Sequence, residues 1–254
     1  AESIGDLIHS ETELQRQQAI KLVQGNASDY YNNLREKLVK SLAYIEAQID
    51  FAEDDLPDSV LKEVKMSISE VREDIKKIID DNKIGEKIRE GFRVAIIGEV
   101  NAGKSSLLNL LSKREAAIVS EEEGTTRDII ETYLNIDGYP VILADTAGIR
   151  EAKNEIEKKG ISLAISKSEE ADLNLIVIDN SSNILNKKIE SLINDKSIVV
   201  LNKSDVDNKH KHNFKKAVLI SVKENRNINE LINKIKDQLS TKFALTKNIL
   251  ITRE

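Results

Sequence analysis

The chain of 254 residues is 40% hydrophobic, carries a formal net charge of −6 and contains no cysteine. This composition excludes disulfides, thiolate-held metal sites and a free-standing basic nucleic-acid binder. No apolar run approaches about 18 residues and no signal peptide opens the chain, so we expect a cytoplasmic protein without a membrane partner.

The N-terminal third of the sequence is predicted to be helical. A first helix is expected over Asp6–Val23, ending near Gly25. Apolar residues recur at helical spacing over 34–49 and again over 60–78, which predicts two long amphipathic helices. A turn near Ala52–Asp58 separates them, and its proline suits the start of the second helix.

The rest of the sequence alternates short apolar runs with helical segments, which is typical of a mostly parallel sheet flanked by helices. The pair Asp137-Gly138 between two of the runs predicts a hairpin, and hence one antiparallel edge strand. We therefore expect an α/β domain over residues 91–243, attached to an all-α helical domain over residues 1–90. Strands are expected at 92–97, 132–136, 141–145, 197–201 and 217–220.

The segment Gly98–Ser105 reads Gly-Glu-Val-Asn-Ala-Gly-Lys-Ser and directly follows the first predicted strand. A strand, a glycine-rich turn and a helix opening at Lys104 form a phosphate-binding loop, because backbone N–H groups and the helix dipole attract phosphate oxygens. Lys104 can reach the terminal phosphates, and the Ser105 hydroxyl can bind Mg²⁺. Nucleotide contacts are expected from Asn101, Ala102, Gly103, Lys104, Ser105 and Ser106.

A second motif identifies the base. The run Asn202-Lys203-Ser204-Asp205 follows a buried strand about 100 residues after the phosphate loop. A carboxylate at Asp205 can accept hydrogen bonds from N1–H and the 2-amino group of guanine, which adenine does not offer. Lys203 can lie along the base and ribose, and backbone N–H groups of Ser221-Val222-Lys223 can meet the guanine carbonyl. The expected ligand is GTP or GDP.

Two further segments are predicted to contact the γ-phosphate and Mg²⁺. Asp145-Thr146-Ala147-Gly148 follows a strand, and Asp145 can hold Mg²⁺ through a water. A threonine of the Gly124–Asp128 run, Thr126, can complete the Mg²⁺ shell while GTP is bound. This switch loop is expected to contribute Ser120, Glu121, Glu122, Glu123, Gly124, Thr125 and Thr126. In order and spacing, the motifs resemble those of the GTPase superfamily over residues 92–240.

The position after Asp145–Gly148 is Ile149, where Ras-like enzymes carry the glutamine that orients the attacking water. A branched apolar side chain cannot polarise water, so catalysis must come from elsewhere. Arg127 and Arg150 are candidates by location only.

A related group of GTPases uses K⁺ instead, and its signature asparagine stands at Asn101. That resemblance implies a K⁺ ion held by the Asn101 amide oxygen and by switch-loop residues Ser120, Glu122 and Thr125, where it would neutralise charge on the bridging oxygen. The alternative is that Asn101 only shapes the turn.

Three stretches outside the general motifs sharpen the resemblance. They are Asp6-Leu7-Ile8 with the helix that follows, Ile45–Phe51 with Glu53–Leu56, and the second switch from Asp145 to Ile161. Together they make essentially the whole chain similar to the MnmE (TrmE) family of tRNA-modification GTPases.

The resemblance implies a G domain inserted into the helical domain, and pairing of two G domains when K⁺ is bound. It also implies that an acidic residue of the second switch helix, Glu157, assists hydrolysis alongside Asn101 and Lys104. The alternative is that Glu157 is an ordinary solvated helix carboxylate.

The family acts with an FAD-dependent partner, MnmG, on carbon 5 of the wobble uridine of certain tRNAs, with a folate one-carbon donor. Its N-terminal folate-binding domain has no counterpart before Ala1, and residues 244–254 resemble the start of the return into the helical domain. We therefore expect a truncated chain that binds GTP but does not bind folate or complete tRNA modification.

Two other interpretations stay open. Ribosome-assembly GTPases of the Era or Der type can share Asn101 and the Gly124–Asp128 run, but they carry an RNA-binding domain after the G domain or a second G domain, whereas the extra domain here precedes the G domain and is acidic and helical. A helical scaffold that holds nucleotide with little turnover is compatible with Ile149.

Overall fold

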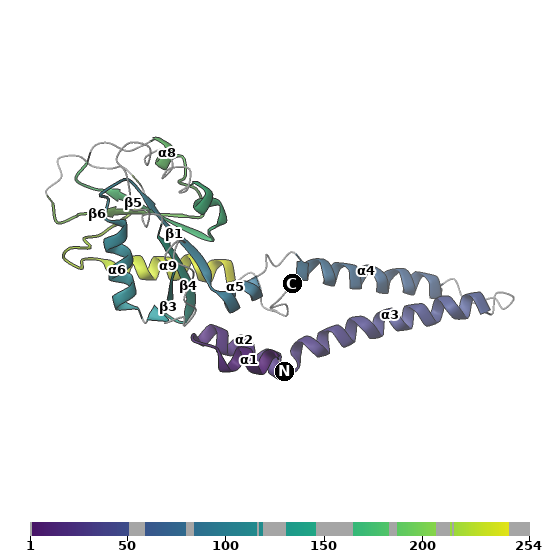
Figure 1. Cartoon of the computed structure of the whole chain (residues 1–254). Coiled ribbons are helices and arrows are strands. Elements are labelled where there is room, and N and C mark those ends of the chain that lie inside the picture. The colour runs from purple at the N-terminus through teal and green to yellow at the C-terminus, as the bar shows by residue number, and fades with distance from the viewer. Residues whose placement is uncertain are drawn as a thin grey trace. The chain divides into compact units, whose positions relative to one another are not determined.

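The structure, a computed structural model, divides into two compact units (Figure 1). The first, the helical unit, takes in Ala1–Ser10 and Gln15–Arg89, and the second, the α/β unit, takes in Glu11–Leu14 and Glu90–Leu245. The turn predicted near 52–58 and the return predicted at 244–254 lie outside the described residues. The structure describes residues 2–50, 59–79, 84–115, 117–118, 131–145, 165–182, 187–206, 214 and 216–243.

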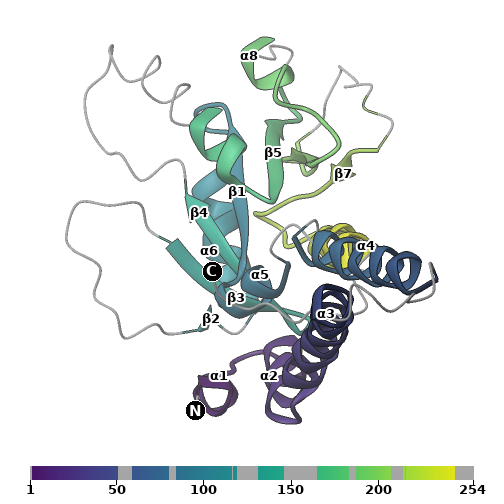
Figure 2. The ribbon, with the colours of Figure 1, turned by 90° about the vertical axis from the view of Figure 1, so that its right-hand side faces the viewer.

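The helical unit is built around two long helices. α3 (Asn26–Asp50) and α4 (Ser59–Ile79) run side by side in opposite directions (Figures 1 and 2). Apolar and small side chains on their facing sides, among them Leu34, Val64 and Val71, are buried. These two helices confirm the two amphipathic helices predicted from the sequence.

The single helix predicted over Asp6–Val23 is wrong, because the structure has two helices there. α1 (Glu2–Ile8) ends where the Ser10 hydroxyl donates to the carbonyl of Leu7 over 2.8 Å. α2 (Glu13–Val23) begins afresh, and its Leu14 N–H donates to the carbonyl of Gly138 over 3.2 Å. The first N–H groups of a helix need partners outside it, so this contact with a β-turn favours a helix start at this point.

A short helix ties the N-terminal helices together. Side chains of α2 donate hydrogen bonds to backbone carbonyls of α5 (Ile84–Glu90). The Gln18 amide donates to the carbonyl of Gly85 over 3.0 Å, and the Gln15 amide donates to the carbonyl of Arg89 over 2.9 Å. The Arg89 guanidinium in turn pairs with Asp6 of α1 at 2.9 Å.

The α/β unit holds one seven-stranded sheet in the order β2-β3-β4-β1-β5-β6-β7. Strands β4, β1, β5, β6 and β7 are parallel, and β3 is antiparallel to β4, as the hairpin signal predicted. A two-residue strand, β2, lies outside β3. The strands are β1 (Phe92–Gly98), β2 (Ala117–Ile118), β3 (Glu131–Ile136), β4 (Tyr139–Asp145), β5 (Leu173–Asp179), β6 (Ser197–Asn202) and β7 (Val218–Leu219).

The central strands are buried along almost their whole length. In β5 six consecutive residues are buried, and β1 has four in a row. Successive side chains of a strand point to opposite faces, so both faces of the sheet must be covered. Among the described residues of this unit, the helices are α6 (Lys104–Arg114), α8 (Lys187–Glu190) and α9 (Ile228–Phe243), and residues 165–170 are also helical.

The parallel strands bring the nucleotide motifs to one edge of the sheet. The phosphate loop follows β1, the Asn202–Asp205 motif begins at the last residue of β6, and Ser221–Lys223 follows β7. Ligands of open α/β sheets bind at the carboxyl ends of the strands. In the described part of the chain, no helix has the length and apolar character needed to cross a membrane.

Candidate nucleotide-binding site

The phosphate loop connects β1 to α6 through a left-handed backbone. Asn101 has φ 64° and Gly103, the residue before α6, has φ 98°. The Lys104 ammonium donates to the carbonyls of Gly98 and Glu99, at 3.0 Å and 2.8 Å. It therefore lies over the loop, at the positive end of α6, where phosphate oxygens would be attracted.

Two glycines of the loop are required by their surroundings. A Cβ at Gly103 would lie 2.2 Å from the side-chain nitrogen of Asn202, and one at Gly98 would lie 2.2 Å from the carbonyl oxygen of Val177. These distances are far inside van der Waals contact. The loop can thus approach β5 and β6 only because neither residue has a side chain.

Asn202 joins the two halves of the site. Its Nδ2 donates to the carbonyl of Ala102 over 2.9 Å, and its Oδ1 accepts the Val222 N–H over 3.1 Å. The residue is 3% exposed. One buried amide side chain therefore fixes the phosphate loop against the loop that follows β7.

Asp205, which is predicted to bind the guanine base, accepts a hydrogen bond from Ser221. The Ser221 hydroxyl donates to Oδ1 of Asp205 over 2.6 Å and itself accepts the Glu224 N–H over 3.1 Å. The pKa of Asp205 is lowered, first by this hydroxyl and then by a backbone N–H, and these effects outweigh burial. The side chain is thereby kept as a carboxylate, which only accepts hydrogen bonds.

The loop after β7 is a tight turn. Ser221 and Arg226 exchange two backbone hydrogen bonds of 3.2 Å and 2.9 Å, and Asn225 adopts φ 54°. The N–H groups of Ser221 and Val222 are thus engaged within the protein. Lys223 lies beyond them in the same turn and is exposed.

Sequence reasoning missed one charged residue of this site. Asp179, the last residue of β5, pairs through Oδ2 with the Lys203 ammonium at 2.5 Å. Nothing in the local sequence distinguishes it, because the pair exists only once β5 and β6 lie side by side.

The candidate Mg²⁺ ligands meet the preference of that ion for oxygen. Ser105 is exposed in the first turn of α6, and Asp145 ends β4 beside Ile96 of β1. Mg²⁺ commonly takes one or two protein oxygens together with substrate phosphates, so these groups fit it. Among the described residues, no cluster of three His, Asp or Glu side chains could hold a metal by itself.

Several predicted site residues lie outside the described residues. They are Ser120, Glu121, Glu122, Glu123, Gly124, Thr125, Thr126, Thr146, Ala147, Gly148, Ile149 and Glu157. Among the predicted K⁺ ligands, the structure therefore describes Asn101 alone, which is exposed in the phosphate loop and carries the amide oxygen that the predicted K⁺ site needs.

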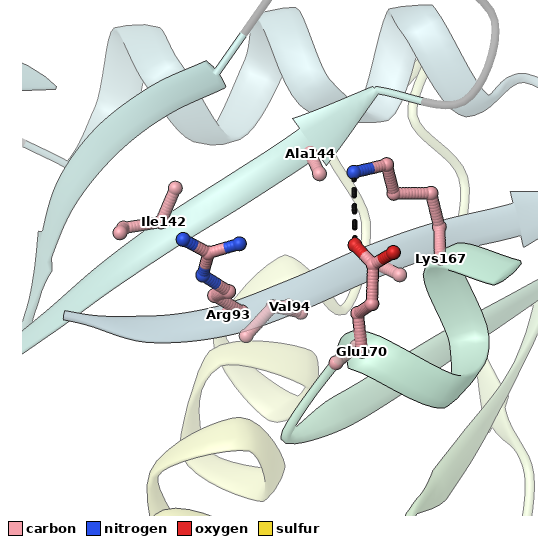
Figure 3. Close-up of a pocket in the computed structure, with 8 residues that line it drawn as sticks. Arg93, Val94, Ile142, Ala144, Lys167 and Glu170 are labelled. Carbon is pink, nitrogen blue, oxygen red and sulfur yellow. Dashed lines mark hydrogen bonds and ion pairs between the residues drawn. The ribbon is translucent and has the colours of Figure 1, made fainter. Parts of the chain in front are cut away.

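A separate hollow lies on the sheet near the start of β1 (Figure 3). Lys167 and Glu170 form an ion pair of 3.1 Å at its edge, and this pairing lowers the pKa of Glu170. Its lining includes Arg93, Val94, Ile142, Ala144, Lys167 and Glu170 and contains none of the predicted nucleotide residues. Arg93 lies at the end of β1 away from the phosphate loop, so the hollow is not part of the nucleotide site.

Comparison with known proteins identifies the family. Residues 1–254 match the family described as "MnmE helical domain". The chain belongs to the MnmE family. It is 61% identical over 209 residues to "tRNA modification GTPase MnmE" of Pelagibacter ubique (strain HTCC1062), covering 82% of this chain and 47% of the relative.

Other MnmE proteins match the whole chain. The protein of the same name from Rickettsia canadensis (strain McKiel) is 40% identical over 261 residues, covering 100% of this chain and 59% of the relative. The chain thus spans about half the length of the curated MnmE relatives it matches. A crystal structure of Era from Aquifex aeolicus is 30% identical over 57% of this chain and 56% of that chain, with a TM-score of 0.42.

Proposed function

We propose that this chain is the GTP-hydrolysing part of an MnmE protein, stimulated by K⁺ and acting in modification of carbon 5 of the wobble uridine of tRNA. The observation that carries the proposal is Asn202. Its amide joins the Ala102 carbonyl of the phosphate loop to the Val222 N–H of the guanine loop. A single nucleotide whose phosphates and base occupy the two loops would account for that arrangement. The name of the MnmE relatives, tRNA modification GTPase, supports the proposal.

Guanine recognition is assigned to Asp205, Lys203 and the turn after β7. The ionised Asp205 would accept from N1–H and the 2-amino group of guanine. Because the N–H groups of Ser221 and Val222 are engaged within the protein, the N–H that meets the guanine carbonyl is assigned to Lys223.

Measuring nucleotide affinity by calorimetry tests this assignment. We expect GDP to bind about four orders of magnitude more tightly than ADP. Asp205→Asn should exchange this preference for xanthosine diphosphate, because an amide N–H can donate to the second carbonyl of xanthine. The control, Asp237→Asn, changes an exposed carboxylate on α9 and should leave GDP binding intact. Equal affinity for GDP and ADP in the unaltered chain would reject the proposal.

Hydrolysis is assigned to charge stabilisation rather than to a glutamine. Lys104 would contact the terminal phosphates. Mg²⁺ would be held by Ser105 and Thr126, with Asp145 reaching it through water, and K⁺ by Asn101, Ser120, Glu122 and Thr125. When bound, the two cations would neutralise negative charge that develops on the phosphate oxygens.

Glu157 is assigned the role of assisting the attacking water. Glu157→Ala should therefore lower GTP turnover while changing GDP affinity little, because the carboxylate would act only during the chemical step. Stopped-flow binding together with single-turnover hydrolysis measures the two effects separately. Unchanged turnover would instead identify Glu157 as a solvated helix residue.

The domain bounds, partners and location of the chain are proposed from its similarity to MnmE. We propose a helical domain over residues 1–90, a G domain over 91–243 and the return into the helical domain over 244–254. The proposed partners are a second G domain, a MnmG-type FAD enzyme and tRNA, with folate bound by the family's N-terminal domain. The proposed location is the cytoplasm.

A further inference from the structure

The ion pair between Asp179 and Lys203 links the ends of two neighbouring strands. Asp179 closes β5 and lies in register with Asn202, the last residue of β6. The Asn180 N–H donates to the Asn202 carbonyl over 2.8 Å, so the two strand ends are joined beyond the sheet. Lys203 follows directly.

The backbone of Lys203 turns sharply at this point. Its φ is 68°, in the left-handed region that costs an ordinary side chain about 1–2 kcal/mol. In this conformation its ammonium lies 2.5 Å from Oδ2 of Asp179. The charge-assisted hydrogen bond favours a conformation that the backbone alone disfavours.

Asp179 is itself held in place by Ser181. The Ser181 N–H and hydroxyl both donate to Oδ1 of Asp179, over 2.9 Å and 2.6 Å. Both carboxylate oxygens are therefore used, one by Ser181 and one by Lys203. Burial by itself would raise the pKa of Asp179, but the hydrogen bonds from Lys203 and Ser181 outweigh it and lower the pKa.

We infer that Asp179 is a positioning residue for guanine binding, which holds the Lys203 stem in place for the base. The inference rests on the proposed function, in which Lys203 lies along the purine. The Asp179 side chain is 18% exposed and that of Lys203 is 34% exposed, so the pair is shielded enough to hold one geometry. A lysine fixed beforehand loses less conformational freedom when the nucleotide binds.

The test is a double-mutant cycle on GDP affinity, measured by calorimetry. Asp179→Asn keeps the shape of the side chain and removes its charge, and we expect GDP affinity to fall about tenfold. In the Lys203→Ala background the same substitution should change affinity less than about twofold, because the group that Asp179 positions is gone. Asp137→Asn is the control, since it breaks the exposed ion pair with Lys236 in the same unit and should leave affinity unchanged.

A second variant tests the same positioning role with a substitution that leaves the ion pair in place. Ser181→Ala keeps both charges but removes one donor that orients Asp179, and should cost about threefold in GDP affinity, again only when Lys203 is present. Full affinity in Asp179→Asn, or an equal loss with and without Lys203, would overturn the inference. Failure of the unaltered chain to bind GDP would instead reject the proposed function.

Discussion

At the scale of single residues, the proposed guanine recognition depends on the charge state of Asp205. The Ser221 hydroxyl is the largest influence that lowers its pKa. A lowered pKa means that the carboxylate stays ionised to a lower pH than an ordinary aspartate, whose pKa is about 3.9. Guanine should therefore be recognised at any pH above the lowered pKa of Asp205, and recognition should disappear only as the pH falls through that pKa.

Ser221→Ala should raise the pKa of Asp205 toward its ordinary value, because the largest stabiliser of the charged form is lost. Carboxyl chemical shifts followed by NMR against pH measure this directly. GDP binding of the variant should begin to weaken at a higher pH than that of the unaltered chain. Ser240→Ala, which removes a hydroxyl bonded only within α9, is the control. An Asp205 titration that is identical in both proteins would contradict the account.

Residue chemistry was predictable where it lies within one motif. Lys104, Asn202 and Asp205 stand in short runs whose spacing indicates a guanine nucleotide, and the structure places those runs at one edge of the sheet. Asp179 was not predictable, because its partner is 24 residues away and reaches it only through strand pairing. A lone aspartate at the end of a strand carries no such signal.

At the scale of elements, the loop between β1 and α6 depends on a residue without a side chain. Gly103→Ala would introduce strain at φ 98° and a Cβ 2.2 Å from the buried Asn202 side chain. Asn202 would have to move and lose its bonds to both loops, so GDP affinity should fall at least about 100-fold. Calorimetry measures the loss.

Gly5→Ala is the matched control for that variant. Gly5 lies within α1 and a Cβ there meets nothing within 4 Å. Alanine in a helix should leave the nucleotide site unaffected and stabilise α1 by about 0.5–1 kcal/mol. Equal GDP affinity in Gly103→Ala and Gly5→Ala would show that the loop does not need its left-handed glycine.

The helical hairpin makes a separate prediction. Val71 is 3% exposed between α3 and α4, whereas Val39 is 51% exposed on α3. Val71→Ala should lower the opening free energy of α4 amides by about 1–2.5 kcal/mol, through lost burial and a cavity. Val39→Ala should change it by at most about 0.5 kcal/mol. Native-state hydrogen exchange measures both, and similar values for the two variants would contradict the described packing.

Elements were predictable where their periodicity runs unbroken. Repeated apolar spacing predicted α3 and α4, and the Asp137-Gly138 turn predicted the hairpin of β3 and β4. The break between α1 and α2 was not predictable, because it depends on a hydrogen bond from Leu14 to the distant Gly138. Strand β2, with only two residues, is too short to show a period.

At the scale of the whole molecule, the change in charge balance along the sequence lies close to the boundary between the helical unit and the α/β unit, near residue 90. Residues 1–91 hold 13 basic and 20 acidic side chains, and residues 92–254 hold 25 and 24. The sequence therefore predicted an acidic helical part and a nearly neutral α/β part. It did not predict that Glu11–Leu14 belong to the α/β unit, since that assignment follows from packing.

We propose that a cation beside Asn101 replaces the glutamine that Ras-like enzymes carry at the position of Ile149. Asn101 adopts φ 64°, so Asn101→Gly removes the amide oxygen while tolerating the left-handed backbone. Asn109→Ala, at an exposed asparagine of α6, is the matched control.

Measuring GTP turnover of the chain in K⁺ and in Na⁺ at equal ionic strength tests this role of the cation. We predict stimulation by K⁺ of about tenfold or more, lost in Asn101→Gly and kept in Asn109→Ala. Equal turnover in the two salts, or full K⁺ stimulation in Asn101→Gly, would mean that a K⁺ ion held by Asn101 does not support hydrolysis.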